Sequence, residues 1–256
     1  MKRFTLVILA LFFVLTNTCI CYGESYTKKN IALAASDGFN LKATLTYPKI
    51  KGKREYKTVI LIHSLGTNSE WWGELPSMLL KNGYATLAID LRGHGGSVYN
   101  ARLGKVSWKS LTNNAYKKYP KDVTEIVNYI QEEYPKLKFF NDWAIVGSDI
   151  GGSAGIIAAD MLNIKPKTIV LLSPVVQTKG LYVPVSVAQL NGVDFLSISS
   201  GDDAASLEAE KYIMKFAQNE FSIYTSPSKH SGMVLLKNDP EIAPFIAEWL
   251  KQYLND

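Results

Sequence analysis

The sequence is almost free of cysteine. Its 256 residues include two cysteines, Cys19 and Cys21, and both lie within the first 23 residues. If that segment is removed, no thiol remains, which excludes disulfide bonds, thiolate metal sites and a cysteine nucleophile. A domain of this size does not need such cross-links, because it can bury a large hydrophobic core.

Long runs of one charge sign are also missing. The chain has 28 Lys and Arg against 23 Asp and Glu, a formal net charge of +5, and its basic residues are interspersed with acidic ones. This pattern does not predict a nucleic-acid partner. Hydrophobic residues make up 47% and charged residues 20%, which is typical of a globular protein that is not disordered.

The only long apolar run lies at the N-terminus. Lys2 and Arg3 precede residues 4–15, which are apolar except for Thr5. The run is too short for a membrane span, which needs about 20 apolar residues, and it fits a secretory signal peptide. We expect cleavage after Gly23, export to the periplasm or the extracellular space, and no membrane span in the mature domain, residues 24–256. An uncleaved N-terminal anchor is the alternative.

Strand-like and helix-like patterns alternate along the rest of the chain. The strand-like runs cover residues 31–36, 40–47, 58–63, 84–91, 143–147, 168–173, 194–199 and 221–225. Asp37-Gly38 between the first two runs predicts a hairpin. Apolar residues at 123, 126, 127 and 130 have the spacing of one buried helix face, and the last helix is expected near residues 242–249.

This order predicts an α/β fold with a mostly parallel eight-stranded sheet. The N-terminal hairpin is antiparallel, and helices cover both faces of the sheet. Only residues 174–193 separate two of the late strands. They leave room for a loop and a short helix, so we expect no lid domain. The number of subunits cannot be read from the sequence.

The three histidines, His63, His94 and His230, each follow a different strand. No two of them have the spacing of ligands on one helix face, and no dinucleotide or phosphate-loop glycine pattern occurs, so neither metal nor cofactor is expected. We expect His63 to shape the loop after its strand. His94 is expected in a solvent-facing turn among glycines.

Three segments carry a family resemblance. Leu61-Ile62-His63-Ser64-Leu65-Gly66, Asp90-Leu91-Arg92-Gly93-His94-Gly95 and the stretch from Ala144 to Gly152 resemble three landmarks of the α/β-hydrolase superfamily in order and spacing. The resemblance covers nearly the whole chain after the signal. The chain is similar to lidless esterase, dienelactone-hydrolase-like and peptidase-like members, and this resemblance implies a hydrolase of small molecules.

The resemblance assigns the site residues. The family places a nucleophilic serine on a tight turn between strand and helix, and here that position is Asp149. Asp203 and His230 match the acid and the histidine. The backbone N–H groups of Leu65 and Ile150 match the oxyanion hole.

Other residues near these positions have simpler explanations. The literal G-x-S-x-G pattern at 151–155 is a decoy, because Ser153 is expected about one turn inside the helix. Ser148 precedes the tip by one residue, so its side chain should point elsewhere. Asp203 can also serve as a helix N-cap.

An aspartate at the turn leaves three hypotheses open. The first is a hydrolase of small ester-like or related substrates that works through Asp149, Asp203 and His230. The second is an aspartate-nucleophile enzyme that attacks a saturated carbon, as haloalkane dehalogenases and epoxide hydrolases do with a G-x-D-x-G-G turn. The third is a non-catalytic relative that binds a ligand. The retained acid and histidine favour an enzyme.

Overall fold

The computed structural model describes residues 26–254, so the predicted signal peptide lies outside the described residues. The eight expected strands are all present and form one sheet. They are β1 (Tyr26–Ala34), β2 (Phe39–Pro48), β3 (Thr58–Ile62), β4 (Ala85–Asp90), β7 (Trp143–Ser148), β8 (Thr168–Leu172), β11 (Asp194–Ser200) and β12 (Phe221–Ser226).

The sheet runs in the order β12-β11-β8-β7-β3-β4-β2, and β1 pairs with β2. β3, β4, β7, β8, β11 and β12 are parallel, whereas β1 and β2 are antiparallel to their neighbours. Four two-residue strands were not predicted. They are β5 (Tyr99–Asn100) and β6 (Gly104–Lys105), which extend the sheet, and β9 (Gln177–Thr178) and β10 (Leu181–Tyr182), which form a separate hairpin.

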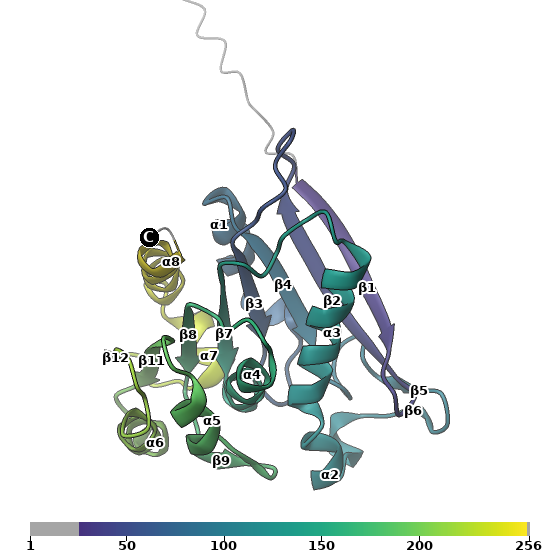
Figure 1. Cartoon of the computed structure of the whole chain (residues 1–256). Coiled ribbons are helices and arrows are strands. Elements are labelled where there is room, and N and C mark those ends of the chain that lie inside the picture. Colours follow the sequence, from purple (N-terminus) through teal and green to yellow (C-terminus); the bar gives the residue numbers. More distant parts are fainter. Residues whose placement is uncertain (1–25, 255–256) are drawn as a thin grey trace, which may run out of the picture.

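Helices cover both faces of the sheet, as expected (Figure 1). The α-helices are α1 (Leu75–Lys81), α2 (Asn113–Tyr116), α3 (Tyr119–Glu133), α4 (Ile150–Met161), α5 (Pro184–Gln189), α6 (Ala204–Met214), α7 (Gly232–Asn238) and α8 (Ile242–Leu254), and the 3-10 helices are η1 (Ser69–Trp72) and η2 (Trp108–Ser110). Residues 174–193 contain β9, β10 and α5, and no lid domain is inserted there.

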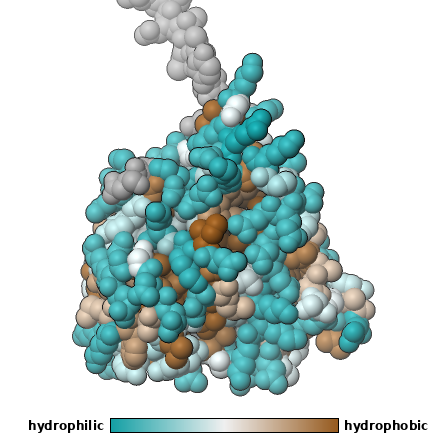
Figure 2. Space-filling view, viewed as in Figure 1, coloured by the Kyte–Doolittle hydropathy of each residue, from teal (hydrophilic) through white to brown (hydrophobic). Residues whose placement is uncertain are grey.

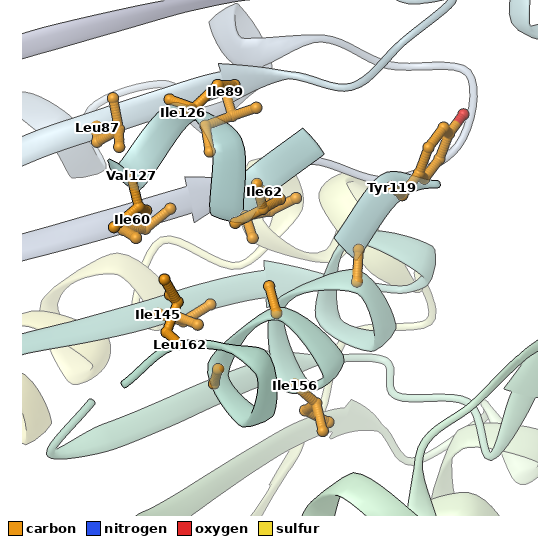
Figure 3. Close-up of a cluster of buried hydrophobic side chains, with 14 of the residues drawn as sticks. Ile60, Ile62, Leu87, Ile89, Tyr119, Ile126, Val127, Ile145, Ile156 and Leu162 are labelled. Carbon is orange, nitrogen blue, oxygen red and sulfur yellow. The ribbon is translucent and has the colours of Figure 1, made fainter. Parts of the chain in front are cut away.

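The core has two layers because side chains alternate across each strand. On β3, Ile60 and Ile62 join the cluster under α3 and α4, whereas Val59 and Leu61 join the cluster under α1 and α8. Figure 3 shows isoleucines of β3 and β7 facing the apolar side of α3 and α4. The predicted helix face at 123, 126, 127 and 130 is fully buried.

The outer surface matches a globular domain. The face seen in Figure 2 is largely hydrophilic, with separate hydrophobic spots. Within residues 26–254, no helix combines the length and hydrophobicity needed to cross a membrane. The same part of the chain contains no group of three or more His, Cys, Asp or Glu side chains arranged to hold a metal ion.

Candidate active site

Asp149 lies at the tip of a tight turn between β7 and α4. Its backbone angles are φ 51° and ψ −121°, a conformation that residues other than glycine rarely adopt. Its N–H donates to the carbonyl of Leu172 (2.9 Å), and its carbonyl accepts from the N–H of Ser153 (3.2 Å). Such strain persists only where the surrounding structure enforces it, and it concentrates at functional sites. Ser153 lies inside the first turn of α4, as expected.

Glycines on either side of Asp149 make this turn possible. A Cβ on Gly147 would lie 2.6 Å from the Cα of Gly152, and a Cβ on Gly151 would overlap the carbonyl oxygens of Ile62 and His63. The first turn of α4 therefore packs directly on the backbones of β7 and β3. The sequence Gly-Ser-Asp-Ile-Gly-Gly thus fixes the position of Asp149 at the carboxyl edge of the sheet, where open parallel sheets bind ligands.

The Asp149 carboxylate is buried beside two backbone donors. Burial raises the pKa of this carboxyl group, the nearby N–H groups of Ile150 and Leu65 lower the pKa, and the negative charge of Asp203 raises it again. The net direction is upward. Both N–H groups assigned from the resemblance thus converge on the carboxylate itself.

We predict that Asp149→Asn stabilises the fold above neutral pH. The raised pKa means that the folded protein disfavours the ionised group, so the amide should increase the free energy of unfolding by about 0.5–2 kcal/mol at pH 8. The gain should shrink as the pH falls through the raised pKa, because wild-type Asp149 then becomes neutral. Urea denaturation at pH 8 and pH 4.5 measures both. Asp202→Asn, at an exposed neighbour, is the matched control, and equal stability of the two variants at pH 8 would contradict the prediction.

Asp203 and His230 lie in the loops after β11 and β12. Asp203 caps α6: its carboxylate accepts from the N–H (3.1 Å) and the hydroxyl (2.8 Å) of Ser206. His230 is exposed, and its N–H donates to the Ser228 hydroxyl (3.3 Å), but its imidazole makes no hydrogen bond within residues 26–254. The fold therefore brings Asp203 near Asp149 without joining His230 to either carboxylate.

Three buried serines at the ends of β3, β7 and β8 support the loop that carries His230. The hydroxyls of Ser64 and Ser148 are 2.7 Å apart, and the Ser173 hydroxyl accepts from the N–H of Gly232 (2.8 Å). A Cβ on Gly232 would lie 3.1 Å from the Ser64 hydroxyl. This cluster was not predicted from the sequence, although each serine directly follows or ends a predicted strand.

His63 and His94 hold the loop after β3 in place. The Nε2 atom of His63 accepts from the N–H of Leu91 (3.1 Å), so its Nδ1 carries the proton and donates to the carbonyl of Ser64 (2.7 Å). The Nε2 atom of His94 accepts from the N–H of Gly66 (3.0 Å). Burial lowers the pKa of both rings, that of His63 to about 4, so both stay neutral near pH 7. The solvent-facing turn expected for His94 is wrong, because its side chain is 2% exposed.

Arg92 holds the loop after β4 in place. Its guanidinium forms two 2.5 Å hydrogen bonds to the Asp122 carboxylate and one of 2.7 Å to Asp37. Burial alone would lower its pKa, but the bonds to Asp122 and Asp37 raise it, so Arg92 stays charged. Asp90 adds a second brace, since its carboxylate accepts from the N–H groups of Ser69 and Gly96 (2.8 Å each).

A separate groove of about 700 Å³ lies between η1 and α1 on one side and α7 and α8 on the other. Trp71 and Trp72 line it, and Trp71 is half exposed. The groove does not include Asp149, Asp203 or His230. The residues that the sequence predicts to be catalytic therefore lie outside this groove.

The parallel sheet, the antiparallel N-terminal hairpin, the covering helices and the tight turn at Asp149 define an α/β-hydrolase fold. The family model described as serine aminopeptidase, S33, matches residues 53–201, more than half of the chain, and the chain belongs to this family. The family is named for a serine, but the residue at the turn here is an aspartate. No curated protein matches the chain by sequence.

Solved structures of esterases and of a dienelactone hydrolase share the fold. An esterase from Pyrococcus furiosus superposes with a TM-score of 0.67 at 17% identity, covering 90% of this chain and 92% of that one. A carboxyl esterase from Bacillus coagulans gives 0.67 at 12% identity, with 89% and 98% covered. Dienelactone hydrolase from Anabaena variabilis gives 0.63 at 18% identity, with 89% and 99% covered. At these identities the likeness establishes the fold, not the substrate.

Proposed function

We propose that this protein is a hydrolase of small molecules in which the Asp149 carboxylate is the nucleophile, assisted by His230 and Asp203. The supporting observation is that the N–H groups of Leu65 and Ile150 face the carboxylate of Asp149 itself and lower its pKa against the effect of burial. A buried carboxylate on two fixed donors is oriented for attack and needs no base to deprotonate it.

The placement of these donors favours attack on a saturated carbon. An oxygen of Asp149 forms a bond to that carbon, and the leaving group departs with its electron pair, which gives an ester on Asp149. Water, deprotonated by His230, then adds to the Asp149 carboxyl carbon, and negative charge develops on the oxygen beside Leu65 and Ile150. The product alcohol leaves with an oxygen that belonged to Asp149.

Hydrolysis of an ordinary ester fits this arrangement less well. A substrate carbonyl would need the same two N–H groups that Asp149 occupies, and attack by a carboxylate would give a mixed anhydride. Within the hydrolase class we therefore favour substrates with a carbon–halogen or epoxide bond over esters. The exposed imidazole of His230 has to turn toward Asp149 in the second step, and no hydrogen bond within residues 26–254 holds this ring in its present orientation.

One pair of observations favours a second candidate, a ligand-binding protein without catalysis. Asp203 directs its carboxylate at Ser206, and the imidazole of His230 is exposed. Retention of both residues at the positions of the family's acid and histidine makes the enzyme the first candidate.

Oxygen-18 labelling distinguishes the two candidates. Multiple turnovers of 1-bromobutane or styrene oxide in labelled water should place oxygen-18 in the peptide that contains Asp149, because each hydrolysis exchanges one carboxylate oxygen. His230→Gln should accumulate the ester, which is visible as added intact mass. Turnover without label in this peptide would contradict the nucleophile assignment, and the lack of any reaction would support the binding protein.

We also propose that the protein is exported after removal of residues 1–23. The basic start and the short apolar run that follows it support this proposal. N-terminal sequencing of the protein from the culture medium or periplasm of an expressing bacterium should find Glu24 as the first residue. A retained Met1 would favour the N-terminal anchor.

A further inference from the structure

Two segments that follow β4 and β8 carry an excess of positive charge. Residues 97–118 contain five cations, Arg102, Lys105, Lys109, Lys117 and Lys118, and no acid. This segment alone has a charge of +5, equal to the formal net charge of the whole chain. Residues 174–193 add Lys179 and again contain no acid. The rest of the chain is therefore neutral or slightly negative overall, and the positive charge is concentrated in these loops.

The fold places the first of these loops beside the Asp149 site. The Trp108 ring stacks on the His94 ring, with centroids 5.7 Å apart and planes within 6°. A Cβ on Gly66 would lie 3.2 Å from the same indole, and Gly66 follows Leu65, whose N–H faces the Asp149 carboxylate. The Lys109 ammonium lies 5.7 Å from the Trp108 ring centroid. Lys109 is thus held next to the loop that contacts Asp149.

Two more lysines meet where α2 contacts the β9–β10 hairpin. The side chain of Lys117 lies against Gly180, and the Lys179 ammonium lies 5.4 Å from the Tyr116 ring centroid. The hairpin packs on α4, the helix that begins directly after Asp149. Figure 1 shows α2 and β9 at the end of the molecule to which β3, β7 and β8 point.

These three lysines lack a carboxylate partner. Within residues 26–254, no Asp or Glu oxygen lies within ion-pair distance of Lys109, Lys117 or Lys179, whereas the neighbouring Lys118 pairs with Asp37 at 2.7 Å. All three are exposed. Their contacts with aromatic rings are weak at such exposed sites, so the ammonium groups are free to turn toward a ligand.

We propose that Lys109, Lys117 and Lys179 bind an anionic group, a carboxylate or a phosphate, on the substrate. The acids of the site, Asp149 and Asp203, repel the negative end of such a molecule, so its electrophilic carbon faces Asp149 while the anionic group faces the lysines. This inference rests on the proposed function and names its substrate class.

Bromoacetate and bromoacetamide form a matched pair of probes. They differ mainly in charge, and both lose bromide when a carboxylate oxygen attacks the adjacent carbon. In the His230→Gln background, the rate of ester formation on Asp149 is followed by intact mass. We expect the triple variant Lys109→Gln/Lys117→Gln/Lys179→Gln to lower the rate of ester formation with bromoacetate about tenfold at low salt. The rate with bromoacetamide should stay unchanged. Added sodium chloride should remove the difference.

A control variant loses three positive charges at the opposite end of the sheet, where the parallel strands begin. Lys51, Lys81 and Lys136 are exposed and precede β3, β4 and β7, so their triple Gln variant should leave both rates unchanged. Equal slowing of bromoacetate by both triple variants would show a net-charge effect and overturn the proposal, as would equal slowing of both probes.

A binding arm separates this inference from the proposed function. If neither probe alkylates Asp149, the nucleophile assignment fails, and the lysine site is judged by binding alone. Titration of the unmodified protein with succinate should shift the indole N–H resonance of Trp108, whereas neutral succinamide should not. The loss of this shift in the Lys109/Lys117/Lys179 variant supports the site. No shift, or the same shift with both compounds, overturns it.

Discussion

Replacing Asp149 by serine should produce a new esterase activity. The shorter side chain frees the N–H groups of Leu65 and Ile150, which face the carboxylate in the wild-type protein and lower its pKa. A substrate carbonyl can then occupy them, while the serine hydroxyl at the same strained position supplies the nucleophile. We expect Asp149→Ser to hydrolyse p-nitrophenyl acetate about 100-fold faster than Asp149→Ala, the lower end of what a base-activated nucleophile contributes.

The comparison with alanine isolates the nucleophile, because both variants free the same two donors. Adding His230→Gln to Asp149→Ser should abolish the gain, since the hydroxyl then lacks a base. Release of p-nitrophenolate measures all three variants, and circular dichroism checks their fold. Equal rates for folded Asp149→Ser and Asp149→Ala would show that position 149 does not face a competent site.

Removing the buried Arg92 charge should destabilise the domain by about 3–5 kcal/mol, the cost of leaving a buried partner unpaired. Arg92 is 3% exposed, and its partner Asp122 is 2% exposed. In Arg92→Met, two hydrogen bonds to Asp122 and one to Asp37 are lost, and the Asp122 carboxylate stays buried without a countercharge. Urea denaturation at pH 7 measures the change.

Two further variants test the cause of that loss. Arg102→Met removes the same charge from an exposed position and should cost less than about 0.5 kcal/mol. The double variant Arg92→Met/Asp122→Leu should recover part of the loss, because both charges are then absent. A double variant as unstable as the sum of its single variants would show that packing, and not the unpaired charge, sets the cost.

Most of the fold was predictable because its signals are local. The apolar run that ends at Ile62 is continuous, since both faces of β3 are covered, and the α3 residues at 123, 126, 127 and 130 repeat with the period of a helix. Asp37-Gly38 marked the first hairpin, and Gly147 with Gly151 marked the tight turn at Asp149. In each case one short segment contains the whole physical reason for its structure.

The remaining features depend on residues that are distant in the sequence. Nothing near His94 shows that its ring is buried under Trp108, and nothing near Arg92 shows that Asp122 and Asp37 close around it. The β9–β10 hairpin is too short to give a periodic signal. The catalytic assignment of Asp203 and His230 came from resemblance, and it stays a prediction until activity is measured.

The burial of His63 and His94 leaves this enzyme candidate with one chemically accessible imidazole. The chain has three histidines, and two of them are enclosed and fully hydrogen-bonded in their neutral form. Reagents that acylate imidazoles from solvent therefore encounter His230 alone. His230 can therefore be labelled selectively in the unmodified chain. The label would lie on the residue that has to move in the proposed mechanism.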